Sequence, residues 1–188
     1  MFKKTLLAVV TTAVFSATAF NASAEDQGHG IVTFSGTVIT APCSVTPESS
    51  QIDVDLGQVA DSVLNGGQYS QPADFSIKLR DCILSTTDDK GVKTTTDKVN
   101  VTFTSANVDS NDASLMVNTK ESNYGGATGV GVRIMDAGYV TLGSAVPVVF
   151  TDTNPTQNLD FHARMESKGK NATEGDVYAQ ANYVLAYK

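Results

Sequence analysis

Apolar and polar residues alternate along several short stretches of this chain, and β-branched residues are common in them. A period of two places one face of an extended strand against a core and leaves the other face in water. The stretches are residues 31–40, 99–104, 130–135 and 146–150. Turn-forming residues separate them, at positions 65–67, 88–91, 124–126 and 152–155. Many short strands divided by such turns predict an all-β, antiparallel sandwich.

This pattern predicts little helix. Only residues 59–64 suit a short helical turn, which Asn65 and Gly66 would end. Residues 85–98 are polar, rich in threonine and nearly free of large apolar groups, so we expect a hairpin tip or a mobile loop there. Residues 166–175 are similar, with Gly169 and Asn171 between charged residues, and we expect a second surface loop.

The first two dozen residues have the features of a secretory signal peptide. Lys3 and Lys4 precede an uncharged apolar stretch over residues 6–20, and the small residues at positions 22–24 suit a signal peptidase. A retained membrane anchor is the alternative, but the apolar run is shorter than the roughly 20 residues that a spanning helix needs. We therefore expect a signal peptide over residues 1–24 and a mature chain that begins at Glu25.

The composition of the mature chain limits its partners. Its length suits one domain. Loss of Lys3 and Lys4 with the leader changes the formal net charge from −7 to −9. Such an acidic chain has no need to attract phosphate, which argues against nucleic acid and anionic membrane surfaces as partners.

The chain has two cysteines, Cys43 and Cys82, and two histidines, His29 and His162. An even pair of cysteines in an exported protein predicts a disulfide, which would stabilise the fold by about 4 kcal/mol for a loop of about 40 residues. A free thiol pair is the alternative. These few soft ligands, with no Cys-x-x-Cys motif, argue against a metal site, and we expect no cofactor.

The segment ahead of Cys43 is unusual for the edge of a domain. A polar, glycine-containing start is followed at once by a strong strand pattern, with Val32, Phe34, Gly36 and Val38 on one face. A glycine inside a strand costs backbone entropy and offers no side chain to pack. A bulge or a tight crossing would explain Gly36. Alternatively, side chains of another chain fill the space over it.

The C-terminal segment keeps its alternation up to the last residue. Val177, Ala179, Ala181, Tyr183, Leu185 and Tyr187 alternate with polar or small residues. The last strand of an ordinary sandwich can have this pattern for packing reasons alone. Chain ends usually fray, however, so we expect a partner to hold this one.

The two ends together resemble those of fimbrial subunits of the chaperone–usher pathway, most closely the major pilins of the P-pilus and mannose-resistant Proteus-like types. The resemblance rests on residues 28–43 (GHGIVTFSGTVITAPC), 75–82 (FSIKLRDC), 129–136 (GVGVRIMD) and 179–188 (AQANYVLAYK). Members of this family also have a glycine fourteenth from the C-terminus and an aromatic penultimate residue, and Gly175 and Tyr187 occupy these positions.

The resemblance implies an incomplete immunoglobulin-like sandwich that lacks its seventh strand. Residues 41–188 would form this pilin domain, and residues 25–40 would be a donor strand that completes a neighbouring subunit. Val32, Phe34 and Val38 would then insert into the neighbour's groove, and Gly36 would mark its shallow point. The product would be a surface fibre, or fimbria, used in adhesion.

The resemblance also implies assembly partners. A periplasmic chaperone would cover the groove by docking along the C-terminal strand, at Tyr183, Leu185 and Tyr187, with Gly175 at its start and the carboxylate of Lys188 as anchor. An outer-membrane usher would then exchange the chaperone for the extension of an identical or related pilin. The chain would thus pass through the periplasm to the cell surface without inserting into a membrane.

Other classes of protein fit the sequence less well. The sequence has no Gly-x-Ser-x-Gly motif, and the pattern of His29 and His162 suits solvated or edge residues, so enzymatic activity is not expected. The mature chain has no room for the extra lectin domain of a tip adhesin. A minor adaptor or terminator pilin and a monomeric immunoglobulin-like binding module stay open.

Overall fold

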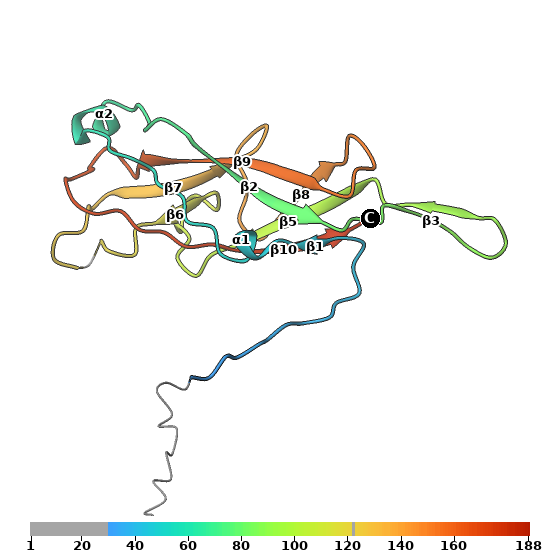
Figure 1. Ribbon diagram of the computed structural model, residues 1–188. Helices are drawn as coiled ribbons and strands as arrows, with labels where there is room; N and C mark the ends of the chain where they lie inside the picture. Colours follow the sequence, from blue (N-terminus) through green and yellow to red (C-terminus); the bar gives the residue numbers. More distant parts are fainter. Residues whose placement is uncertain (1–29, 122) are drawn as a thin grey trace, which may run out of the picture. The chain divides into compact units, whose positions relative to one another are not determined.

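The computed structural model describes residues 30–121 and 123–188 (Figure 1). Two units are distinguished, and residues 39–188 are the compact one. Residues 30–38 are the described part of the other unit. The predicted signal peptide and the first residues of the predicted extension lie outside the described residues. Among the described residues, no helix is long and apolar enough to cross a membrane.

Nearly all regular structure in the compact unit is antiparallel β-sheet. One sheet has the strand order β1-β2-β9-β7-β6, and a second has the order β10-β5-β8. The first sheet comprises β1 (Ser44–Val45), β2 (Ala73–Arg80), β9 (Gln157–Ser167), β7 (Val130–Met135) and β6 (Leu115–Val117). The second comprises β10 (Asn182–Tyr187), β5 (Lys98–Thr104) and β8 (Ala145–Val149).

Three small elements complete the fold. Strands β3 (Ser85–Thr87) and β4 (Lys93–Thr95) form a separate two-stranded hairpin, as the polar stretch over residues 85–98 predicted. Helix α2 (Asp61–Asn65) is the short helical turn expected in this region. Helix α1 (Pro47–Ser50) was not anticipated.

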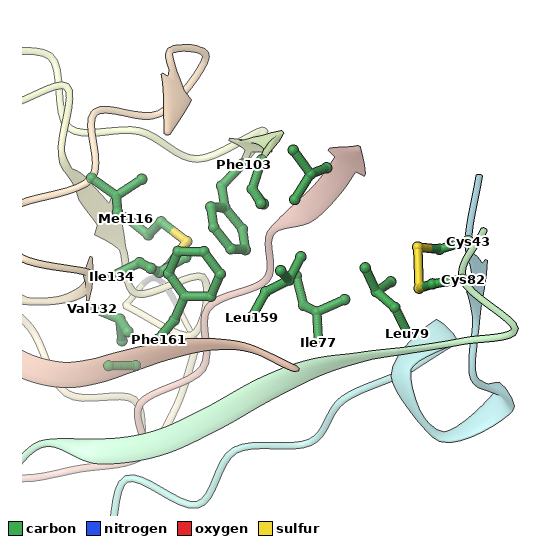
Figure 2. Packing of buried hydrophobic residues seen from close by; sticks show 14 of the residues in the cluster. Cys43, Ile77, Leu79, Cys82, Phe103, Met116, Val132, Ile134, Leu159 and Phe161 are labelled. Atoms are coloured by element: carbon green, nitrogen blue, oxygen red, sulfur yellow. A yellow bond between two sulfur atoms is a disulfide. The ribbon is translucent and has the colours of Figure 1, made fainter. Parts of the chain in front are cut away.

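The core lies between the two sheets, as Figure 2 shows. Ile77 and Leu79 of β2 and Leu159 and Phe161 of β9 are fully buried, because both strands turn their alternate residues toward the second sheet. The Phe161 ring packs edge-on against that of Phe103 of β5, with 5.0 Å between the ring centroids. Alternation therefore correctly predicted the inward face of each long strand.

A disulfide joins Cys43 to Cys82, and so connects the chain just before β1 to the chain just after β2 (Figure 2). The predicted disulfide is thus present. It lies at one end of the core, beside the point at which the residues that follow the N-terminal extension enter the sandwich.

One local prediction was wrong. Residues 166–175 are not simply a surface loop, because β9 continues to Ser167 and Glu166 is only 6 % exposed. The Glu166 carboxylate accepts hydrogen bonds from Arg133 Nε at 2.8 Å and Arg164 Nε at 2.7 Å, which satisfies its charge in a buried site. Residues 30–40 join no strand ladder within the described chain, so the expected strand over residues 31–40 has no partner there, and its pairing with another chain stays a prediction.

Candidate functional site

A long open groove runs along one side of the compact unit, with a volume of about 1800 Å³. One wall is the segment over residues 50–61, and the other is the C-terminal segment over residues 173–183. The floor is apolar and comes from both sheets. It consists of Phe75, Phe103, Met116, Val130, Val132, Ile134, Ala163 and Met165.

The first wall is an extended segment without a strand partner. Ile52, Val54 and Leu56 are half-buried, while the residues between them are exposed. This is the alternation of a half-buried β-strand. Within the described chain, however, residues 51–59 make no backbone–backbone hydrogen bond. Apart from Gly57 N, which donates to Asp55 Oδ1 at 2.8 Å, their backbone groups are therefore available to another strand.

The second wall is an edge strand whose free side faces the groove. Antiparallel neighbours exchange hydrogen bonds at every second residue. The even-numbered residues bond inward: Lys188 N donates to Lys98 O at 3.0 Å beside the antiparallel ladder, and Asp176 O, in a parallel bridge with Gly126, accepts from Ala127 N at 3.0 Å. The backbone groups of the odd-numbered residues from 177 to 187 consequently point to the open side, because β10 has only β5 as a neighbour.

The side chains of these odd-numbered residues point into the sandwich but are only half-buried. They are Val177, Ala179, Ala181, Tyr183, Leu185 and Tyr187, all of which pack against the edge of the core. An added strand could therefore pair with the free backbone groups of this segment and cover its apolar side chains. The sequence predicted this alternation.

Side chains hold the first half of this wall in place, where no strand ladder does. Asn118 is 2 % exposed, and its amide nitrogen donates to Ala127 O at 2.7 Å and Asp176 O at 2.9 Å. Its amide oxygen accepts a hydrogen bond from Tyr178 N at 2.9 Å. Further along, Ser105 Oγ donates to Gln180 O at 2.8 Å. The edge is therefore preformed along its whole length.

Gly175 is required where this wall begins. Its φ of +142° is rare for residues with a side chain, and a Cβ there would lie 2.4 Å from Ala127 N. This close approach allows the two hydrogen bonds between Asp176 and the chain at Gly125 and Ala127. The glycine singled out in the sequence thus has a structural reason in the fold.

The aromatic residues of β10 differ in their polar contacts. Tyr183 Oη donates to Ser49 O of α1 at 2.5 Å, which links the two walls at one end of the groove. The hydroxyl of Tyr187 is buried and has no partner among the described residues. Burial raises the phenol pKa of both Tyr183 and Tyr187 above the ordinary value.

The described part of the N-terminal extension exposes its apolar face. Val32, Phe34 and Val38 are 75 %, 90 % and 101 % exposed. A Cβ added at Gly36 would meet no atom within 4 Å, so nothing in the isolated chain requires a glycine there. Among the described residues, no neighbouring atom explains the glycine at position 36.

The described residues offer little that resembles a catalytic or metal site. No group of three His, Cys, Asp or Glu side chains among them could hold a metal ion. His162 is a half-exposed residue of β9 whose Nδ1 lies 2.6 Å from Asp74 Oδ1. His29 lies outside the described residues.

Sequence reasoning missed the first wall and Asn118. The alternation in residues 51–56 (QIDVDL) was a sufficient signal for the wall, since it has the same period as the strands that were predicted. Asn118 gave no such signal, because its hydrogen bonds to Asp176 and Tyr178 form only when segments distant in sequence meet.

Known proteins resemble this chain over nearly its whole length. The family model described as fimbrial protein matches residues 32–188. An uncharacterized fimbrial-like protein of Escherichia coli K12, YgiL, is 50 % identical, and the alignment covers 100 % of this chain and 98 % of the relative. The major MR/P fimbria protein of Proteus mirabilis is 34 % identical, with 97 % of each chain covered.

A solved structure extends the likeness to the fold. A subunit of a chaperone–usher pilus superimposes with a TM-score of 0.67 and 29 % identity, covering 86 % of this chain and 97 % of the pilus chain. The expected fold class, an immunoglobulin-like sandwich that is incomplete, is thereby confirmed, as is the resemblance to chaperone–usher and Proteus-type pilins. The chain belongs to the fimbrial protein family and is a structural, non-enzymatic subunit of chaperone–usher pili, which are surface appendages.

Proposed function

We propose that this subunit polymerises by donor-strand exchange, with residues 25–40 of one copy completing the sandwich of the next. The observation that carries the proposal is the C-terminal wall, whose odd-numbered residues present unpaired backbone groups and half-buried apolar side chains to one groove. A donor strand would satisfy both needs at once, by adding a strand to a sheet edge.

The extension supplies what the groove lacks. Val32, Phe34 and Val38 would enter the groove. Gly36 would lie where the groove is too shallow to hold a side chain. Each buried apolar side chain is worth about 1.5–3 kcal/mol. An uncovered groove of this kind also exposes sheet edges that invite aggregation, so the free subunit gains solubility as well as stability from the inserted strand.

The donor strand runs antiparallel to β10 in this proposal. The two walls run in opposite directions, so a strand between them is antiparallel to one and parallel to the other. Antiparallel pairing is the more stable per residue, and β10 is the longer regular edge. This direction also places the exit of the donor strand at the residue-175 end of the receiving subunit, which yields a head-to-tail fibre.

Export before assembly would need a chaperone in the periplasm and an usher in the outer membrane. We infer cleavage of the signal peptide after residue 24, followed by chaperone docking along Tyr183, Leu185 and Tyr187, with the Lys188 carboxylate as anchor. Gly175 fixes the start of the docked edge. Removal of Tyr187 and Lys188 should then abolish chaperone capture, seen as loss of periplasmic subunit, and an unchanged level would contradict this anchor.

We assign the chain to the abundant shaft of the fibre, with a minor adaptor or terminator role as the second candidate. The likeness to a protein named as a major fimbrial subunit supports the shaft assignment. The abundance of this chain in sheared surface fibres would distinguish the two roles.

The direct test moves the donor strand within one chain. In a self-complemented variant, residues 25–40 are absent from the N-terminus and follow Lys188 through a linker of about four residues. Such a linker permits an antiparallel return but not a parallel crossover, which needs a dozen residues or more. We expect this variant to be a stable monomer and the mature chain without residues 25–40 to aggregate. A well-behaved monomer of the latter would refute donor-strand exchange.

Gly36 tests the direction in which the donor side chains point. Gly36→Leu should block fibre growth while chaperone binding persists, because the groove is shallow where this residue crosses it. The matched control is Ser35→Leu, whose side chain lies on the opposite face and should leave growth nearly unchanged. Fibres of normal length from Gly36→Leu would mean that the inward face of the extension is assigned wrongly.

A further inference from the structure

Strands β3 and β4 form a complete hairpin that is encoded by its own turn. Thr86 pairs with Thr94 and Thr87 with Lys93 across the ladder. The turn is closed by Asp88, whose carboxylate accepts hydrogen bonds from Lys90 N at 2.9 Å and Val92 N at 2.8 Å. Gly91 supplies the positive φ of +80° that the turn needs. We call residues 85–95 the ribbon.

The ribbon projects beyond the sandwich from the end at which the C-terminus lies, as Figure 1 shows. Every residue from Thr86 to Thr95 is exposed, including the apolar Val92. A two-stranded hairpin without further packing is at best marginally stable in water. A well-formed ribbon with no core of its own is therefore a candidate for contact with another molecule.

The root of the ribbon is joined to the start of the domain. The disulfide between Cys43 and Cys82 lies directly before it, and Ile83 N donates to Pro42 O at 2.7 Å. Leu84 is buried and accepts a hydrogen bond from Thr96 N at 2.8 Å. Residue 42, where the chain leaves toward the extension, thus contacts the root directly.

The lengths of the two segments bring a neighbouring copy within reach of the ribbon. If Val38 is the last donor residue inside the neighbour, the four residues from there to Pro42 span at most about 14 Å. The ribbon extends about 15 Å from its root, at 3.3 Å for each residue of a strand. The end of the neighbour's groove would therefore lie within about 14 Å of Pro42, a distance similar to the length of the ribbon.

The part of the neighbour at that place follows from the antiparallel direction of the donor strand. It is the end of the groove formed by residues 124–128 and 173–176, which we call the receiving end. The isolated bridge between Gly126 and Asp176 and the hydrogen bond from Asp176 N to Gly125 O at 2.8 Å keep this end rigid. The side chain of Tyr124 stands fully exposed on it.

We propose that the ribbon of each subunit docks on the receiving end of the subunit that holds its donor strand, with Val92 contacting the Tyr124 region. This inference rests on donor-strand exchange and deepens it. The partner is a second copy of this chain. Two attachments from one root, the donor strand and the ribbon, would restrict rotation about the short link over residues 39–42, and so set the angle between successive subunits.

Photo-crosslinking in assembled fibres tests the contact. A benzophenone amino acid is placed at Val92, and fibres are irradiated, boiled in detergent and analysed by mass spectrometry. We expect covalent dimers in which Val92 is linked to a peptide containing residues 124–128 or 173–176. The self-complemented monomer with the same substitution should give none, because it has no neighbour.

Two further measurements separate the possible failures. The same probe at Phe34 should link to the groove of the neighbour. If Phe34 gives that link and Val92 gives none, or links to another surface, the ribbon proposal is overturned and donor-strand exchange stands. If Phe34 itself gives no groove link, donor-strand exchange fails and the ribbon proposal fails with it.

A substitution on the opposite partner completes the test. Tyr124→Ala should lower the yield of the Val92 crosslink about tenfold, the loss expected when an aromatic anchor of an interface is truncated, while the Phe34 crosslink persists. Tyr139→Ala is the matched control, because it removes a half-exposed tyrosine after β7 that contacts Arg133 and Arg164 and not the receiving end. It should change neither yield. Equal effects of the two substitutions would contradict a contact at Tyr124.

Discussion

Strands β9 and β10 have the same alternating pattern in the sequence, but their inward-facing side chains differ in burial. The apolar residues of β9 that face inward are buried, and Leu159 and Phe161 are 0 % exposed. The corresponding residues of β10, such as Leu185, are only half-buried although they pack against the same core. The two strands differ in their neighbours: β9 lies between β2 and β7, whereas β10 has β5 on one side and the groove on the other.

This difference shows what alternation does and does not determine. The period of two establishes which residues of a strand point inward, because side chains alternate between the faces of a sheet. It does not establish how many strands cover them. Half-burial along β10 therefore reflects a missing neighbour in the sheet, and not a weak strand. Each of the following substitutions probes that difference, in order of expected size.

Leu159→Ala should have the largest effect, and the effect should not depend on the donor strand. Truncating a fully buried leucine costs about 2–5 kcal/mol, since a cavity remains in a core that cannot collapse around it. We expect this loss in the self-complemented monomer, measured by urea unfolding. The same loss should occur when Val32, Phe34 and Val38 of the fused strand are replaced by alanine.

Leu185→Ala is the matched substitution on β10, and its effect should depend on the donor strand. With the native donor strand the loss should be about 2 kcal/mol, and with the alanine-substituted strand about 1 kcal/mol or less, because the side chain is then covered on fewer sides. The difference is a coupling energy of the size found for residues in contact. Equal losses in the two backgrounds would mean that the donor strand does not cover Leu185.

The same contrast explains which parts of the fold could be predicted. Strands β5 and β7 were predicted nearly to the residue, because their alternation is strong and local. Residues 31–40 have an equally strong pattern and form no strand within the described chain, since a ladder needs a second segment. The wall over residues 51–59 is extended and unpaired for the same reason. The local pattern predicts which segments can form a strand, and the presence of a neighbouring segment determines whether they do.

Buried polar residues were the least predictable part of the candidate site. Glu166 was expected in a surface loop, but Arg133 approaches it from β7 and Arg164 lies two residues before it on β9, and the two guanidinium groups make its burial possible. Asn118 holds the start of the C-terminal wall through partners up to 60 residues away. Such groups depend on tertiary neighbours, which neither composition nor periodicity encodes.

Substitution of Tyr183 or Tyr187 by phenylalanine gives the smallest expected effects. At neutral pH the two substitutions should change the free energy of unfolding differently. Tyr183→Phe removes the hydrogen bond to Ser49 O and should cost about 0.5–1.5 kcal/mol in the self-complemented monomer. Tyr187→Phe removes a buried hydroxyl that has no partner among the described residues, and should be neutral or slightly stabilising. Urea unfolding at pH 7 compares the two variants directly.

Alkaline pH extends this comparison to the parent protein. Burial raises the phenol pKa of Tyr183 and Tyr187 in the folded subunit, so the folded state keeps protons that the unfolded state releases above about pH 10. The contribution of these groups is fully present below that pH and is lost as pH rises through the folded pKa values. Each phenylalanine variant should therefore lose less stability than its parent between about pH 9 and pH 11, the range around a phenol's ordinary pKa of about 10. Variant and parent share all their other ionisable side chains, so the difference between them isolates the phenol. Parallel curves for parent and both variants would show that neither hydroxyl is buried against the groove.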